Sequence, residues 1–109
     1  MNRGYARVSL ISAINKTNNP YIIRSPRNVL IEVVINGRRK KMMITRLKYK
    51  MGKVCLYKNV LYHSSKKEKV NIVVYHEPKQ QEPWYLIFHA NYDINISAED
   101  IVMLYKRRM

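Results

Sequence analysis

Acidic residues are scarce in this chain of 109 residues, which has seven aspartates and glutamates against 21 lysines and arginines. The formal net charge is therefore +14, which favours a polyanionic partner, most often nucleic acid. A generic solvated basic surface is the alternative. Glycine is scarce as well: the three glycines lie far apart, so the sequence contains no glycine-rich phosphate-binding loop.

The sequence has one cysteine, Cys55, which excludes an internal disulfide and fits a reducing cytosol. We expect Cys55 to be a small buried side chain. No apolar run approaches 18 residues, so we expect no membrane-spanning helix and no membrane partner. The first residues are polar and basic, without the apolar segment of a secretory signal. These patterns predict a cytoplasmic protein.

The residues that usually carry catalysis do not form a recognisable group. His63, His76 and His89 are spaced at equal intervals along predicted strands and have no cysteine pair beside them, which is not the spacing of a zinc site. No two carboxylates are placed for acid–base or metal chemistry. From the residues alone we predict a basic α+β binding module with no metal site and no visible active site.

The positive charge is concentrated in one part of the chain. Residues 38–69 contain twelve lysines and arginines and a single acid, Glu68, so that this segment carries +11 of the +14. Phosphate groups are the expected ligands of such a segment. We predict these DNA-binding residues within it: Arg38, Arg39, Lys40, Lys41, Arg46, Lys48, Lys50, Lys53, Lys66 and Lys67.

The clearest structural signal is a β-hairpin. A run rich in β-branched residues at 29–35 leads into Asn36-Gly37, and a second run follows. Asn and Gly both tolerate the positive φ angles of a type I′ turn, which is the tight turn that matches the twist of a hairpin. The second strand of this hairpin begins at Arg38, so one of its arms carries consecutive cations.

Other elements follow from apolar periodicity and from breaker residues. We predict a short helix over 4–17 and strands over 21–25, 70–77 and 84–90. Residues 53–62 fit either one strand or two short strands broken near Asn59. A last helix should begin at Ser97, because Ser97 and Asp100 have the spacing of a capping box. Ile101, Leu104 and Tyr105 form its apolar face.

Two stretches of the chain resemble bacterial insertion-sequence transposases of the DDE class. The first is NRGYARVSLISAINKTNNPYIIRSPRN, similar to the family's Asp-Arg-Gly-Tyr turn, the helix after it and a strand ending in Arg. The second is EPWYLIFHANYDINISAEDIVMLYKRRM, similar to a Pro-Trp strand followed by the family's Tyr-x-x-Arg…Glu helix. One branch of the family carries a β-rich insertion between these stretches.

The resemblance implies an α+β fold. It would be a partial RNase H-like transposase core dominated by an antiparallel β-strand insertion, with a short N-terminal helix and a C-terminal helix. Residues 1–27 would then supply a core helix and strand, 28–80 the basic β insertion, and 81–109 a core strand and the start of the last catalytic helix.

The resemblance also assigns the catalytic positions. The family uses three carboxylates to hold two divalent ions such as Mg²⁺. Asn2 occupies the position of the second aspartate, and its uncharged amide cannot bridge two cations. The first and third carboxylates are expected to lie before Met1 and after Met109. Tyr105 and Arg108 match the Tyr and Arg of the signature helix.

The function implied is that of a truncated transposase fragment, bacterial and cytoplasmic, catalytically inactive and without a cofactor of its own. It would keep non-specific DNA binding through its basic segment. The alternative is a free-standing basic nucleic-acid-binding module, in which some of the nine tyrosines stack on bases. A weaker third reading is a regulator that interferes with a full-length transposase.

Overall fold

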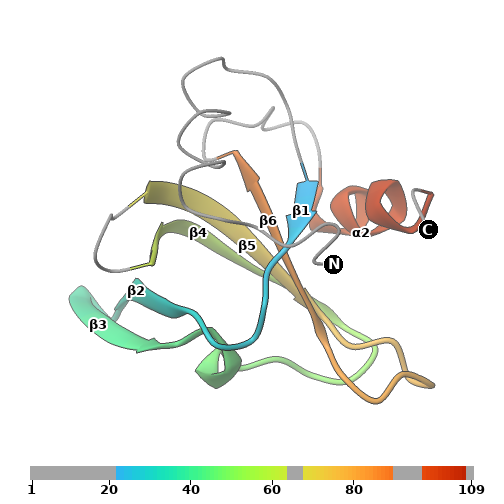
Figure 1. Ribbon diagram of the computed structural model, residues 1–109, viewed down its shortest axis with the longest axis horizontal. Coiled ribbons are helices and arrows are strands. Elements are labelled where there is room, and N and C mark those ends of the chain that lie inside the picture. Colours follow the sequence, from blue (N-terminus) through green and yellow to red (C-terminus); the bar gives the residue numbers. More distant parts are fainter. Residues whose placement is uncertain (1–21, 64–67, 90–96, 108–109) are drawn as a thin grey trace.

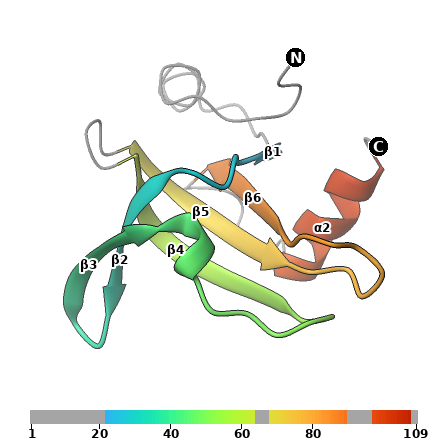
Figure 2. The same ribbon diagram turned by 60° about the horizontal axis from the view of Figure 1, so that its bottom comes forward.

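The computed structural model describes residues 22–63, 68–89 and 97–107. These residues form one six-stranded antiparallel sheet in the order β1-β6-β5-β4-β2-β3, with one α-helix packed on it (Figure 1). The elements are β1 Ile22–Arg24, β2 Leu30–Ile35, β3 Arg38–Met43, the 3₁₀ turn η1 Ile44–Arg46, β4 Val54–Tyr62, β5 Glu68–Tyr75, β6 Trp84–His89 and α2 Ala98–Lys106. The β2–β3 hairpin forms one edge of the sheet, and α2 covers a face of the sheet on the opposite side of the molecule (Figure 1 and Figure 2).

The predicted partial RNase H-like α+β fold is wrong. The described residues form a single antiparallel sheet in which β6 pairs with β1 on one side and with β5 on the other. Ile87 is opposite Ile23 of β1 and opposite Ile72 of β5. The strands assigned to a transposase core and those assigned to an insertion therefore share one hydrogen-bonded sheet. Apolar patterns identify strands, but they do not reveal which distant strands pair.

Two of the predicted elements are confirmed, although the predicted fold class is wrong. The C-terminal helix is confirmed, whereas the predicted N-terminal helix over 4–17 lies outside the described residues. The Asn-Gly hairpin is confirmed too: Asn36 and Gly37 have φ angles of 53° and 76°, and Ile35 is paired with Arg38 across the turn. Positive φ at both central residues is the requirement of the type I′ turn.

Residues 54–62 form one strand, which is interrupted by a β-bulge. The register of β4 against β5 shifts between Tyr57 and Val60, and Asn59 has a φ of 56°. The Asn59 backbone N–H donates to the side-chain Oδ1 of Asn71 at 3.0 Å, which satisfies the donor that the bulge removes from the ladder. A bulge bends its strand and increases the twist. Beyond it, β4 pairs with β2 through Tyr62 and Leu61.

The sheet buries apolar side chains on both faces. On one face a hairpin-side core joins β4, β5 and β6 to β2 and to η1. Its buried members are Val29, Ile31, Val33, Ile44, Leu47, Val60, Tyr62, Val70, Ile72, Val74, Tyr85 and Ile87. On the other face a helix-side core lies under α2, and its buried members are Ile22, Val73, Trp84, Leu86, Phe88, Ile101 and Val102. Alternate residues of β5 thus enter different cores, which explains its nearly continuous apolar sequence.

Helix α2 begins where its capping signal predicts. The Asp100 N–H donates to Ser97 Oγ at 3.1 Å, and the Ser97 N–H donates to Asp100 Oδ2 at 3.2 Å, which completes the capping box. At the other end, Lys106 Nζ lies 2.6 Å from Glu77 Oε2 and 5.3 Å from the centre of the Tyr75 ring. In the described part of the chain, no helix has the length and apolar character needed to cross a membrane.

Candidate nucleic-acid interface

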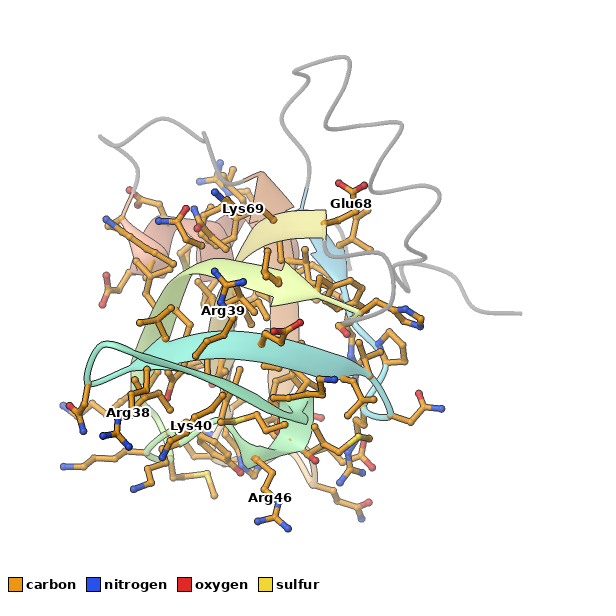
Figure 3. All side chains as sticks on the ribbon, turned by 90° about the vertical axis from the view of Figure 1, so that its left-hand side faces the viewer. Arg38, Arg39, Lys40, Arg46, Glu68 and Lys69 are labelled. Carbon is orange, nitrogen blue, oxygen red and sulfur yellow. The ribbon has the colours of Figure 1, made fainter. Side chains whose placement is uncertain are left out.

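The four consecutive cations of the hairpin lie on an edge strand. Among the described strands, β3 is the last in the sheet order, and its one partner there is β2. Arg38, Arg39, Lys40 and Lys41 are all exposed. Because side chains alternate along a strand, neighbouring cations point to opposite faces. Figure 3 shows Arg38 and Lys40 on one side of the hairpin and Arg39 on the other.

An open groove of about 1000 Å³ runs between β3, the segment around η1 and Tyr57 of β4. We call it the hairpin groove. Its lining residues are Ile35, Asn36, Lys40, Lys41, Met42, Met43, Arg46, Leu47, Lys48 and Tyr57. Four predicted DNA-binding cations, separated by up to eight positions in the sequence, therefore line one groove together with apolar side chains.

A second, smaller groove adjoins the first. It has a volume of about 600 Å³ and is lined by Leu47, Lys48, Tyr49, Lys50, Lys53 and Cys55. We call it the loop groove, and it shares Leu47 and Lys48 with the hairpin groove. Together the two grooves are lined by six of the ten predicted DNA-binding residues: Lys40, Lys41, Arg46, Lys48, Lys50 and Lys53.

Two buried anchors position the cations between the grooves. Ile44 is fully buried, and its N–H donates to the Val29 carbonyl at 2.8 Å. Leu47 is buried as well, and its N–H donates to the Ile44 carbonyl at 3.1 Å, closing the turn of η1. With the anchors three residues apart, Arg46 and Lys48 are left exposed at the surface. Burial of Ile44 and Leu47 thus fixes the backbone that carries the two exposed cations, Arg46 and Lys48, next to β3.

Tyr57 forms part of the groove wall and fixes the segment after η1. Its hydroxyl donates to the Lys48 carbonyl at 2.5 Å. Burial, and secondarily the nearby Cys55 thiol, raises the pKa of Tyr57. The phenol of an ordinary tyrosine is already protonated at neutral pH, so this hydroxyl can donate the hydrogen bond. The contact ties β4 to the backbone of one groove cation. The ring is half-buried against the hairpin-side core.

The loop groove is tied to the end of β5 through His76. The His76 Nε2 lies 2.8 Å from the Gln80 carbonyl oxygen, and its Nδ1 lies 3.2 Å from the Tyr49 hydroxyl. A carbonyl can only accept, so Nε2 donates, and the Nδ1 of a neutral ring accepts from Tyr49. His76 is buried. This histidine of the evenly spaced set is therefore a structural link between a groove wall and the sheet.

The remaining predicted site residues lie elsewhere. Arg38 and Arg39 are on β3 outside the groove linings, while Lys66, Lys67, Asn2 and Arg108 lie outside the described residues. Tyr105 packs against Trp84 with ring centres 5.4 Å apart and planes at 63°, next to the helix-side core. Tyr105 is thus at the face opposite to the hairpin-side core, and its assignment to the signature helix stays a prediction.

Sequence reasoning did not identify the apolar part of the grooves. Ile35, Met42, Leu47 and Tyr57 come from a strand end, an edge strand, a turn and a bulged strand, so no linear spacing connects them. The abundance of tyrosine was the available signal, and it does not distinguish a groove wall from ordinary packing. Among the described residues, no three His, Cys, Asp or Glu side chains come together to form a metal site.

Comparison of the chain with models of protein families, with curated proteins and with solved structures finds no match. The chemistry of the two grooves and the sequence resemblance are therefore what indicate a function for this chain.

Proposed function

We propose that this chain binds DNA through the phosphate backbone, with little sequence preference, and that it is a catalytically inactive fragment of a transposase. The observation that supports DNA binding is the arrangement of the six cations that line the hairpin and loop grooves. None of the described residues lining either groove is acidic. Cations that line a groove without acidic residues in the lining attract phosphates and release the counterions condensed on DNA.

The transposase part of the proposal rests on the resemblance at the two ends of the chain. Phosphoryl transfer by two metal ions needs anionic bridging ligands, and Asn2 offers a neutral amide where the family has an aspartate. Incubated with supercoiled plasmid and Mg²⁺, the purified chain is expected to leave the plasmid intact. Chelator-sensitive cleavage, in a preparation free of contaminating nuclease, would contradict the claim of inactivity.

A free-standing binding module is the second candidate, and one observation favours it. Segments 22–24 and 84–89 pair in the same sheet as the basic strands, and that sheet has its own cores on both faces. Translation of the DNA around the reading frame separates the two candidates. A transposase remnant predicts an upstream segment with an aspartate and a downstream continuation that reaches a glutamate. If the flanking DNA encodes neither segment, the transposase fragment is refuted and the free-standing binding module is the candidate that remains.

DNA affinity should fall steeply with salt. For duplex DNA, log K falls against log salt with a slope of about −0.9 per phosphate neutralised. We expect the triple variant Lys40→Gln, Arg46→Gln, Lys48→Gln to make this slope shallower by about 2–3, since three phosphate contacts are removed. Fluorescence anisotropy with two duplexes of unrelated sequence, over a series of KCl concentrations, measures both the slope and the lack of sequence preference.

The matched control removes the same charge from other parts of the surface. Lys58, Lys69 and Lys79 are exposed and line neither groove, so the triple variant Lys58→Gln, Lys69→Gln, Lys79→Gln has the same net charge as the groove variant. We expect a clearly smaller change of slope in this control. Equal changes in the two variants would mean that total charge, and not the grooves, attracts the DNA.

A further inference from the structure

The hairpin groove has a feature that phosphate binding does not need. Its cations, Lys40, Lys41, Arg46 and Lys48, accompany an apolar surface formed by Ile35, Met42, Met43, Leu47 and the Tyr57 ring. The phosphate backbone of a duplex is met by cations at the surface, and its bases are stacked and paired inside. A groove that combines cations with apolar and aromatic side chains suits a ligand that is both anionic and flat.

We propose that the hairpin groove holds an unpaired nucleotide, so that the chain prefers single-stranded to double-stranded DNA; this inference rests on the proposed DNA binding. Every nucleobase has an apolar π-face, which can pack on the Tyr57 ring and on the thioether of Met42. The cations Lys40, Arg46 and Lys48 are within the same groove and meet the phosphates on either side of that base.

The structure keeps these groups in place before any ligand arrives. Tyr57 is held by its hydrogen bond to the Lys48 carbonyl, so the ring has a fixed position relative to the backbone from which the Lys48 side chain extends. Ile35 is 37% exposed although it is a large apolar side chain. Its neighbour Val34 is 62% exposed but does not line the groove. A preorganised wall lowers the entropy lost when a flexible single strand binds.

The alternative occupant is an acidic protein segment, which would use the same cations. The groove favours a nucleotide because its apolar part includes an aromatic ring and two methionines. Charge alone predicts the opposite strand preference, since duplex DNA has the higher density of phosphates and the steeper dependence on salt. Tighter binding of the single strand would therefore have to come from the apolar side chains of the groove, because the cations alone favour the duplex.

The test compares three ligands of equal length by fluorescence anisotropy at one salt concentration: oligo(dT), an abasic strand and a duplex. The abasic strand has the phosphates of oligo(dT) but no bases. We expect oligo(dT) to bind about tenfold tighter than the abasic strand, as one stacked base contributes, and tighter than the duplex. Polyglutamate should compete weakly against labelled oligo(dT).

Variants locate the base. Tyr57→Ala should weaken oligo(dT) binding about tenfold. It should weaken binding of the abasic strand clearly less, because there only the support of the Lys48 backbone is lost. Because Tyr57→Ala also removes part of the core, Ile35→Ser is a second variant, at a more exposed position. It should weaken oligo(dT) binding by a smaller factor than Tyr57→Ala. The matched control is Val34→Ser, at the preceding position of the same strand but outside the groove lining. It should change the affinity for neither oligo(dT) nor the abasic strand.

The outcomes distinguish this inference from the proposed function. Equal binding of oligo(dT) and the abasic strand, or tighter binding of the duplex, overturns the base site and leaves phosphate binding intact. Polyglutamate that competes as well as unlabelled oligo(dT) overturns it too, because the groove would then accept any polyanion. Failure of all three DNA ligands to bind refutes the proposed function itself.

Discussion

Replacing Trp84 with alanine is expected to lower the free energy of unfolding by about 3–5 kcal/mol. The Trp84 side chain is 6% exposed and lies in the helix-side core. It packs edge-on against Tyr105 of α2 at 5.4 Å between ring centres, and it lies 6.0 Å from the Tyr75 ring. Truncation leaves a cavity between the sheet and the helix, and α2 loses its largest partner.

Urea unfolding followed by far-ultraviolet circular dichroism measures this loss without relying on tryptophan fluorescence. Trp84→Phe should lose less than Trp84→Ala, because it keeps an aromatic ring against Tyr105. Met103 is on the same helix but is 52% exposed, so Met103→Ala should stay within about 0.5 kcal/mol of the parent. A loss below about 1 kcal/mol for Trp84→Ala would show that α2 does not pack on this part of the sheet.

High pH should destabilise the protein through Tyr62. This side chain is 1% exposed, and its hydroxyl shares a hydrogen bond of 2.8 Å with Ser25 Oγ. Burial raises the pKa of Tyr62 to about 12, and the hydrogen bond with Ser25 opposes part of that rise. The unfolded chain has an ordinary tyrosine with a pKa of about 10, so it releases the phenolic proton first.

The sign follows from this difference in proton binding. The stabilisation is complete below pH 10 and is lost as the pH rises through about 12, because the native state binds the proton over that interval and the unfolded state does not. The loss amounts to about 2–3 kcal/mol for a shift of this size. Tyr57 and Tyr85, whose pKa values are also raised mainly by burial, act in the same direction.

The measurement compares the parent with Tyr62→Phe in urea unfolding at pH 8, 10, 11 and about 12. Tyr62→Phe is less stable at pH 8, since Ser25 loses a partner. Its stability should then fall by about 2–3 kcal/mol less than that of the parent over the alkaline range. If the two proteins lose stability in parallel, Tyr62 titrates like an exposed tyrosine, and its hydroxyl is not buried in solution.

Local signals in the sequence predicted local structure correctly. The Asn36-Gly37 turn requires positive φ, which both residues adopt readily, and the Ser97–Asp100 capping box satisfies backbone donors within one helical turn. The predicted fold class was wrong because it depends on which distant strands pair. Ile87 of β6 is opposite Ile72 of β5, and no property of either segment alone specifies the other.

The candidate site divides in the same way. The sequence by itself determined that the basic segment lies on a hairpin arm and the residues after it, and that neighbouring cations alternate in direction along the strand. Only the tertiary structure decided which cations come together. The buried anchors Ile44 and Leu47 hold the η1 segment in place, and Lys40 and Lys41 line one groove with it and with Tyr57, while Arg39 lies outside that lining (Figure 3). The physical reason is that charge along a chain is additive, whereas a groove requires packing between residues that the sequence keeps apart.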